Sequence, residues 1–138
     1  MLLYINAFRT LGFKPYRCKI LFRHKSGKHT LTLHLVRKMN RADIISTLSQ
    51  HQALLKSHGI ERIGLFGSFV RDEQKETSDI DLLVQFSKDK KSLHNLVSLG
   101  DELEKLFGRD VELVTTESLS KYIGPHILNE VQYAPLYN

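Results

Sequence analysis

The sequence of 138 residues has few cysteines, prolines and methionines and lacks tryptophan. Since a disulfide needs two cysteines, the single Cys18 excludes an internal disulfide and is compatible with a reducing compartment. No apolar run approaches the roughly 20 residues that a membrane-spanning helix requires. The seven histidines lack HExxH-type spacing, which argues against a histidine-based metal site. With 41% hydrophobic and 25% charged residues, the chain is typical of one modest globular domain, expected in the cytoplasm.

Acidic residues are absent from residues 1–38, which contain nine Lys and Arg, whereas residues 39–138 contain eleven Lys and Arg and fifteen Asp and Glu. The two parts carry net charges of +9 and −4, which account for the overall +5. We therefore predict a basic N-terminal extension over 1–38 and a globular domain over 39–138. The extension alternates like a hairpin. Three interpretations stay open: a mis-assigned start ahead of Met39, a mobile arm, or an arm that contacts nucleic acid.

Helical and extended patterns alternate along residues 39–138, which predicts an α/β (α+β) domain with a small mixed β-sheet and flanking helices. Asn40 is a plausible N-cap and Gly59 a plausible end for the first helix, and Gly108 a plausible end for a later one. In chain order the predicted elements are a helix over 40–59, a strand over 63–66, a helix over 68–74, a strand over 80–86 and a helix over 92–107.

Gly67 and Ser68 lie where the strand over 63–66 turns into the predicted helix over 68–74. Free backbone N–H groups at such a turn attract anions. Glycine allows a sharp turn and the close approach of a phosphate, and the serine hydroxyl can donate to a phosphate oxygen. The pair is a candidate phosphate-binding turn, although a Gly-Ser pair alone is weak evidence.

Asp79 and Asp81 flank the first residue of the strand over 80–86. Because side chains alternate along a strand, both carboxylates project to the same side. Adjacent carboxylates repel each other unless a cation lies between them, and their oxygens are preferred ligands of Mg²⁺. We therefore predict that both bind metal. The alternative is a solvated turn before an exposed strand end.

The spacing Gly-Ser-x10-Asp-x-Asp, from Gly67 to Asp81, resembles the signature of the nucleotidyltransferase superfamily related to DNA polymerase β. The short chain resembles the minimal nucleotidyltransferase (MNT) branch of that superfamily over about residues 39–138. The resemblance implies a polymerase β-like nucleotidyltransferase fold. Residues 108–114 resemble the later strand that carries a third acidic ligand, and residues 123–137 resemble the closing helix.

The resemblance also implies roles for individual residues. Asp79 and Asp81 match the first two catalytic metal ligands and Glu112 matches the third, so that two Mg²⁺ ions would be bound. The family usually has Asp at the third position, and the longer Glu112 departs from this pattern. Asp110 lies on the same strand face and is a competing ligand, and an exposed structural role for Glu112 stays open.

Arg71 matches the Arg of a Gly-Ser-x-x-Arg run. With Gly67 and Ser68 it is predicted to bind the nucleotide, and the alternative is an ion pair with a nearby acid. Asp72 replaces the Gly of many relatives, which is compatible with a phosphate nearby if its side chain points outward. The lysines of residues 88–91 are expected to be solvated rather than phosphate-binding.

MNT proteins of this size resemble the antitoxins of two-gene modules whose toxin is a HEPN-domain ribonuclease. The resemblance implies a Mg²⁺-dependent enzyme that transfers AMP from ATP to a tyrosine of the toxin. The alternative is a weak or inactive MNT-fold antitoxin that neutralises the toxin by binding and occlusion, through its acidic domain. Nucleic acid is not an expected partner except through residues 1–38. Apolar residues of the last segment either contact the partner or pack in the core: Ile127, Leu128, Val131 and Tyr133.

Overall fold

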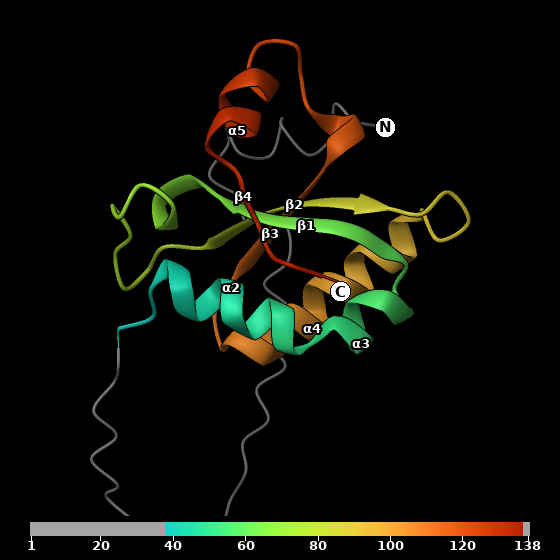
Figure 1. The fold of residues 1–138 in the computed structure, drawn as a ribbon, viewed down its shortest axis with the longest axis horizontal. Coiled ribbons are helices and arrows are strands. Elements are labelled where there is room, and N and C mark those ends of the chain that lie inside the picture. The colour runs from blue at the N-terminus through green and yellow to red at the C-terminus, as the bar shows by residue number, and fades with distance from the viewer. Residues whose placement is uncertain (1–37, 137–138) are drawn as a thin grey trace, which may run out of the picture. The chain divides into compact units, whose positions relative to one another are not determined.

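The computed structural model describes residues 38–136, so that the predicted extension over 1–38 lies outside them apart from Lys38. The described part is a four-stranded mixed sheet with helices on both sides (Figure 1), which confirms the predicted fold class. None of the helices in this part is long and apolar enough to cross a bilayer. One side of the sheet carries α2 (Arg41–Gln50), α3 (Gln52–Ser57) and α4 (Leu93–Phe107), and the other carries α5 (Gly124–Glu130).

The sheet has the strand order β3-β2-β1-β4. Its strands are β1 (Ile60–Phe66), β2 (Ile80–Phe86), β3 (Val111–Thr115) and β4 (Gln132–Tyr133). β1 pairs antiparallel with β2 and with β4, whereas β2 and β3 run parallel. A parallel pair needs a crossover connection, and α4 provides it.

The hydrophobic core lies between the sheet and the helices α2, α3 and α4. Alternate residues of β2, such as Leu82 and Val84, are fully buried in it. The helices contribute Ile44, Leu48, Leu55, Leu99 and Leu103. Because strand side chains alternate, Asp81 projects from the opposite face of the sheet. The core thus fixes which face carries the acidic residues.

The first predicted helix is divided into α2 and α3 at His51. Its start is as predicted, because the Asp43 N–H donates to Asn40 Oδ1 at 3.0 Å and the Asn40 N–H donates to Asp43 Oδ2 at 3.1 Å. The interruption is local. The backbone N–H of His51 donates to the carbonyl oxygens of both Thr47 and Leu48, and this tightened turn ends α2.

α4 has the predicted ends. The N–H of Asn95 donates to Ser92 Oγ at 3.1 Å, which caps the start of the helix. Gly108 ends it in a left-handed conformation with φ of 62°. Local signals therefore suffice to place this element.

Two other predicted helices are corrected by the structure. The helix expected over 68–74 is wrong, because only the short 3₁₀ turn η1 (Gly67–Phe69) forms and Asp72 has a φ of 57°, which an α-helix does not permit. The closing helix is confirmed only for α5. The chain becomes extended at Val131 and continues into β4.

Candidate active site

The three predicted acidic residues lie on the sheet face that is turned away from α2, α3 and α4. Asp81 and Glu112 are direct partners across the parallel pair of β2 and β3. Asp79 lies two residues before Asp81 and therefore on the same side of the chain. All three are half-buried. The register thus brings Glu112 beside Asp81, although these residues are far apart in the sequence.

The donor chemistry of this face fits Mg²⁺, because carboxylate oxygens are the hard ligands that this ion prefers. Within residues 38–136, no three His, Cys, Asp or Glu side chains already converge as a metal-binding group. The exposed Asp110 also borders this face, and its carbonyl oxygen accepts the Ile80 N–H at 2.9 Å. The set of metal ligands, including the choice between Glu112 and Asp110, stays a prediction.

Gly67 joins β1 to η1 and lies against Asp81. Its φ is 76°, in the left-handed region, and a Cβ atom added to it would overlap the Asp81 carboxylate. The turn at Gly67 and Ser68 and the acidic strand end therefore meet only because Gly67 has no side chain. Ser68 is half-buried within η1. The turn and the carboxylates are adjacent in space, as nucleotide binding would require.

Glu130, the last residue of α5, binds this turn and was not predicted from the sequence. The Gly67 N–H donates to Glu130 Oε1 at 3.0 Å. Arg71 Nη1 donates to both oxygens of Glu130, at 3.2 and 3.0 Å. Sixty-three residues separate Gly67 from Glu130, and no local sequence signal connects them.

Arg71 forms the ion pair that was one of its two predicted roles. Its Nε donates to Glu73 Oε2 at 2.9 Å, in addition to the contacts with Glu130. The hydrogen bond to Glu73, and to a smaller extent that to Glu130, raises the pKa of the Arg71 guanidinium above its ordinary value. Its contact with a nucleotide stays a prediction.

Residues 48–137 match the family model described as a nucleotidyltransferase domain, and the match includes the turn and all three acidic residues. The chain belongs to this family. The resemblance inferred from the Gly-Ser-x10-Asp-x-Asp spacing is thereby confirmed, as is the expectation of an enzyme class.

Individual relatives of this nucleotidyltransferase agree with that assignment. The protein adenylyltransferase MntA of Thermococcus cleftensis is 42% identical over 92 residues, which are 66% of this chain and 92% of the relative. A solved structure provisionally named a minimal nucleotidyltransferase is 31% identical with a TM-score of 0.56, covering 70% of this chain and 97% of that chain. A complex of the tri-AMPylated Shewanella oneidensis HEPN toxin with an MNT antitoxin contains a chain that shares the fold, with a TM-score of 0.50 and 21% identity over 67% of this chain and 71% of that chain.

In this nucleotidyltransferase, Arg109 holds the loop that leads to Asp79. Its Nη1 donates to the carbonyl oxygens of Lys75 at 3.3 Å, Glu76 at 2.8 Å and Ser78 at 2.8 Å. Arg109 lies just before β3, so it links the start of β3 to the loop before β2. No motif identified in the sequence pointed to this role.

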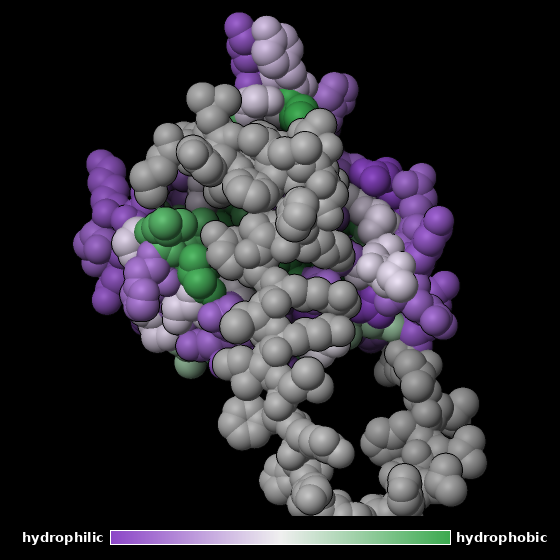
Figure 2. Space-filling model, turned by 180° about the vertical axis from the view of Figure 1, so that it is seen from behind, coloured by the Kyte–Doolittle hydropathy of each residue, from purple (hydrophilic) through white to green (hydrophobic). Residues whose placement is uncertain are grey.

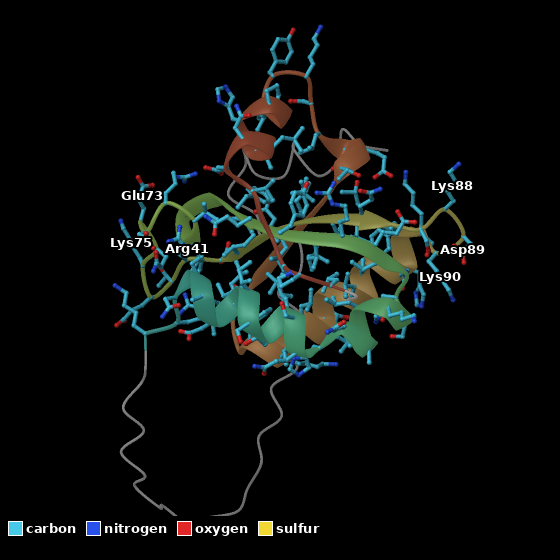
Figure 3. All side chains as sticks on the ribbon, in the orientation of Figure 1. Arg41, Glu73, Lys75, Lys88, Asp89 and Lys90 are labelled. Carbon is cyan, nitrogen blue, oxygen red and sulfur yellow. The ribbon has the colours of Figure 1, made fainter. Side chains whose placement is uncertain are left out.

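Two further charged features lie where the sequence analysis expected them. The side chain of Asp72 is 68% exposed and pairs with Arg41 at 3.8 Å, so it points outward. In Figure 3, Arg41 and Glu73 lie at one end of the sheet and the loop of residues 88–90 lies at the opposite end. The lysines of that loop are therefore far from the turn and exposed, and Lys91, the last lysine of the predicted run, is exposed and pairs with Glu117 at 3.1 Å.

The segment around α5 exposes apolar side chains. In Figure 2 the top of the molecule is mostly hydrophilic with one small green area, and the larger green area lies on the left side. The exposed residues are Tyr122, Ile123 and Leu128. The other three residues predicted here, Ile127, Val131 and Tyr133, are half-buried. Val131 and Tyr133 pack over Gly64 of β1, so packing within the domain accounts for these two.

Proposed function

We propose that this nucleotidyltransferase transfers AMP from ATP to a tyrosine of a partner HEPN ribonuclease toxin and thereby acts as its antitoxin in the cytoplasm. The observation that carries the proposal is the contact of Gly67 with Asp81, with Glu112 beside Asp81 in the sheet. Two comparisons support the choice of substrate. A relative is named protein adenylyltransferase MntA, and a structure of the same fold contains an AMPylated HEPN toxin.

In the proposed reaction the tyrosine oxygen attacks the α-phosphorus of ATP and releases its proton to solvent. The bond from the α-phosphorus to the bridging oxygen breaks, and pyrophosphate leaves. Asp79, Asp81 and Glu112 would hold two Mg²⁺ ions, which supply positive charge that neutralises the phosphate oxygens. The N–H of Gly67, the hydroxyl of Ser68 and the guanidinium of Arg71 would donate to the triphosphate.

Attachment of AMP explains how the toxin would be neutralised. A tyrosine that carries AMP presents a bulky anion, which repels RNA phosphates and blocks their approach. The antitoxin itself would need no substrate domain of its own, because the toxin brings the acceptor hydroxyl to the acidic face.

The test incubates the full chain with ATP, Mg²⁺ and a HEPN-domain protein, and measures the intact mass of both proteins. We expect AMP increments on the HEPN protein with the unchanged chain. The double variant Asp79→Asn, Asp81→Asn should slow transfer by about a hundredfold or more, since it removes two of the proposed ligands. Glu112→Gln should have a similar effect, and Asp110→Asn, the matched control, should keep the rate.

The occlusion alternative predicts a different result. The acidic residues 39–138, with a net charge of −4, would bind a basic RNA-binding surface of the toxin. A stable inhibitory complex without any AMP increment, still protective in the double variant, would overturn the transfer proposal and establish occlusion.

A further inference from the structure

Two of the three donors that the proposed function assigns to the triphosphate, the Gly67 N–H and the Arg71 guanidinium, are already bound to one carboxylate. Glu130 accepts hydrogen bonds from the Gly67 N–H at 3.0 Å and from Arg71 Nη1 at 3.0 and 3.2 Å. Its side chain is only 25% exposed, compared with 48% for Arg71. Glu130 thus lies inward, on the backbone of the turn, rather than extending into solvent.

A carboxylate and a phosphate compete for such donors, because both present anionic oxygens to an N–H group and a guanidinium. A buried backbone N–H needs a partner, and Glu130 supplies one to the buried Gly67. A phosphate that reaches the same N–H would meet the negative charge of Glu130 at hydrogen-bonding distance. The two anions cannot both occupy this position without strong repulsion.

We propose that Glu130 is an internal carboxylate that occupies the phosphate-binding position of the nucleotide-free protein and sets its affinity for nucleoside triphosphates. The inference rests on the proposed function, since it concerns the same site. A phosphate oxygen displaces Glu130 from the Gly67 N–H when the nucleotide binds. Arg71 then turns its Nη1 from Glu130 to the phosphate; its bond from Nε to Glu73 at 2.9 Å is separate from this exchange and is not required for it.

The geometry of α5 makes this exchange feasible. Glu130 is the last residue of α5, and the following chain is fixed to β1 through β4, which pairs at Gly64 and Leu65. The sheet therefore holds the backbone that follows Glu130 in place, whereas the Glu130 side chain has three rotatable bonds. Release of the carboxylate requires a change of rotamer and no rearrangement of the sheet.

The test compares binding of Mg²⁺ and a non-hydrolysable ATP analogue by calorimetry in the unchanged full chain and in Glu130→Gln. Glutamine keeps the size of the side chain and an oxygen acceptor for Gly67, and removes the charge. We expect the Kd to fall about tenfold in Glu130→Gln, which corresponds to the loss of one charged competitor. An unchanged or higher Kd would overturn the inference.

Glu73→Gln is the matched control. It removes the other carboxylate bound to Arg71 and leaves the Gly67 N–H bound to Glu130. We expect the Kd to change less than about twofold, as is usual for an exposed ion pair. An equal gain in affinity for the analogue in both variants would show a general effect of charge near Arg71. It would overturn the proposal that the phosphate displaces Glu130.

A measurement on the unchanged protein covers the case in which Glu130→Gln does not fold. The side-chain carboxyl carbon of Glu130 should shift in the ¹³C NMR spectrum when the analogue binds, and the shift at Glu73 should be smaller. An unchanged Glu130 signal at saturation would overturn the inference, as would failure of the unchanged chain to bind the analogue.

The transfer assay separates this inference from the proposed function. If the unchanged chain transfers AMP and the Kd of Glu130→Gln is not lower, the inference fails and the function stands. If no protein is modified while Glu130→Gln binds the analogue more tightly, the inference stands and the function fails.

Discussion

Gly67 is the residue on which the contact between the turn and the acidic face depends. Two independent constraints act on it. Its φ of 76° is unfavourable for any residue with a Cβ, and the space that a Cβ would take is filled by the Asp81 carboxylate. Gly108 has a similar φ of 62° and no heavy atom within 4 Å of an added Cβ. Substitutions at the two glycines can therefore be compared to separate the effect of backbone strain from the effect of the contact with Asp81.

We expect Gly67→Ala to lower the free energy of unfolding by about 2–4 kcal/mol, because left-handed strain and the displacement of Asp81 add together. AMP transfer should fall more than tenfold, or about 1.4 kcal/mol in the barrier. Urea denaturation and the mass assay measure the two effects. Gly108→Ala should lose only about 1 kcal/mol of stability, from strain alone, and keep its transfer rate. Equal effects of both variants on transfer would contradict a specific role for the Gly67 contact.

At the scale of elements, local chemistry predicts α4 and β2 and fails at the turn after β1. Ser92 and Gly108 mark the ends of α4, and alternating apolar residues mark β2. After β1 the residues favour a helix, but Asp72 is left-handed and the Glu73 N–H donates to the Ser68 carbonyl oxygen at 2.9 Å. In this turn Gly67 and Arg71 contact the distant Glu130. A local sequence pattern carries no information about such contacts.

The tail illustrates the same limit. β4 has only two residues and pairs with β1 at Gly64 and Leu65. The space above Gly64, which Val131 and Tyr133 fill, is a property of the folded sheet. The helical resemblance of residues 123–137 therefore holds for α5 and ends at Glu130. The contact of Glu130 with Gly67 depends on where α5 ends in the folded domain, which explains why no sequence motif predicted it.

The loop before β2 is positioned by a side chain from the start of β3, and this predicts a positioning role for Arg109. Arg109→Lys should lose most of the contacts to the three carbonyl oxygens, because lysine lacks the planar fork of arginine. We expect a loss of stability of about 1 kcal/mol, and a Mg²⁺ concentration for half-maximal transfer that rises severalfold because Asp79 is held less firmly. A Mg²⁺ titration of the transfer rate measures this shift.

The control for that shift is Arg62→Lys, which changes another arginine of the sheet. Arg62 stacks on the ring of Tyr133, 3.9 Å from its centroid, and does not contact the loop before β2 in any described hydrogen bond. It should lose some stability through the weaker stacking and keep the Mg²⁺ dependence. If Arg109→Lys also kept that dependence, Arg109 would have a purely structural role.

At the scale of the whole chain, the predicted division into 1–38 and 39–138 rests on charge. The basic excess lies in residues 1–38. The buried apolar residues of the described part lie between Ile44 and Ala134, and Met39 packs against them. Every residue of the candidate site, from Gly67 to Glu130, belongs to residues 39–138. The boundary at residue 38 stays a prediction from the absence of acidic residues in 1–38.

We therefore expect a chain of residues 39–138 to fold and to transfer AMP as the full chain does. Its Tm should lie within about 4 °C of that of the full chain, which for a domain of this size corresponds to less than about 1 kcal/mol. Thermal denaturation followed by circular dichroism measures the first quantity, and the mass assay the second. A larger loss of Tm would show that residues 1–38 stabilise the domain. Loss of transfer at an unchanged Tm would instead assign the basic residues a role in binding ATP or the toxin, since their positive charge attracts anionic partners and this attraction weakens with added salt.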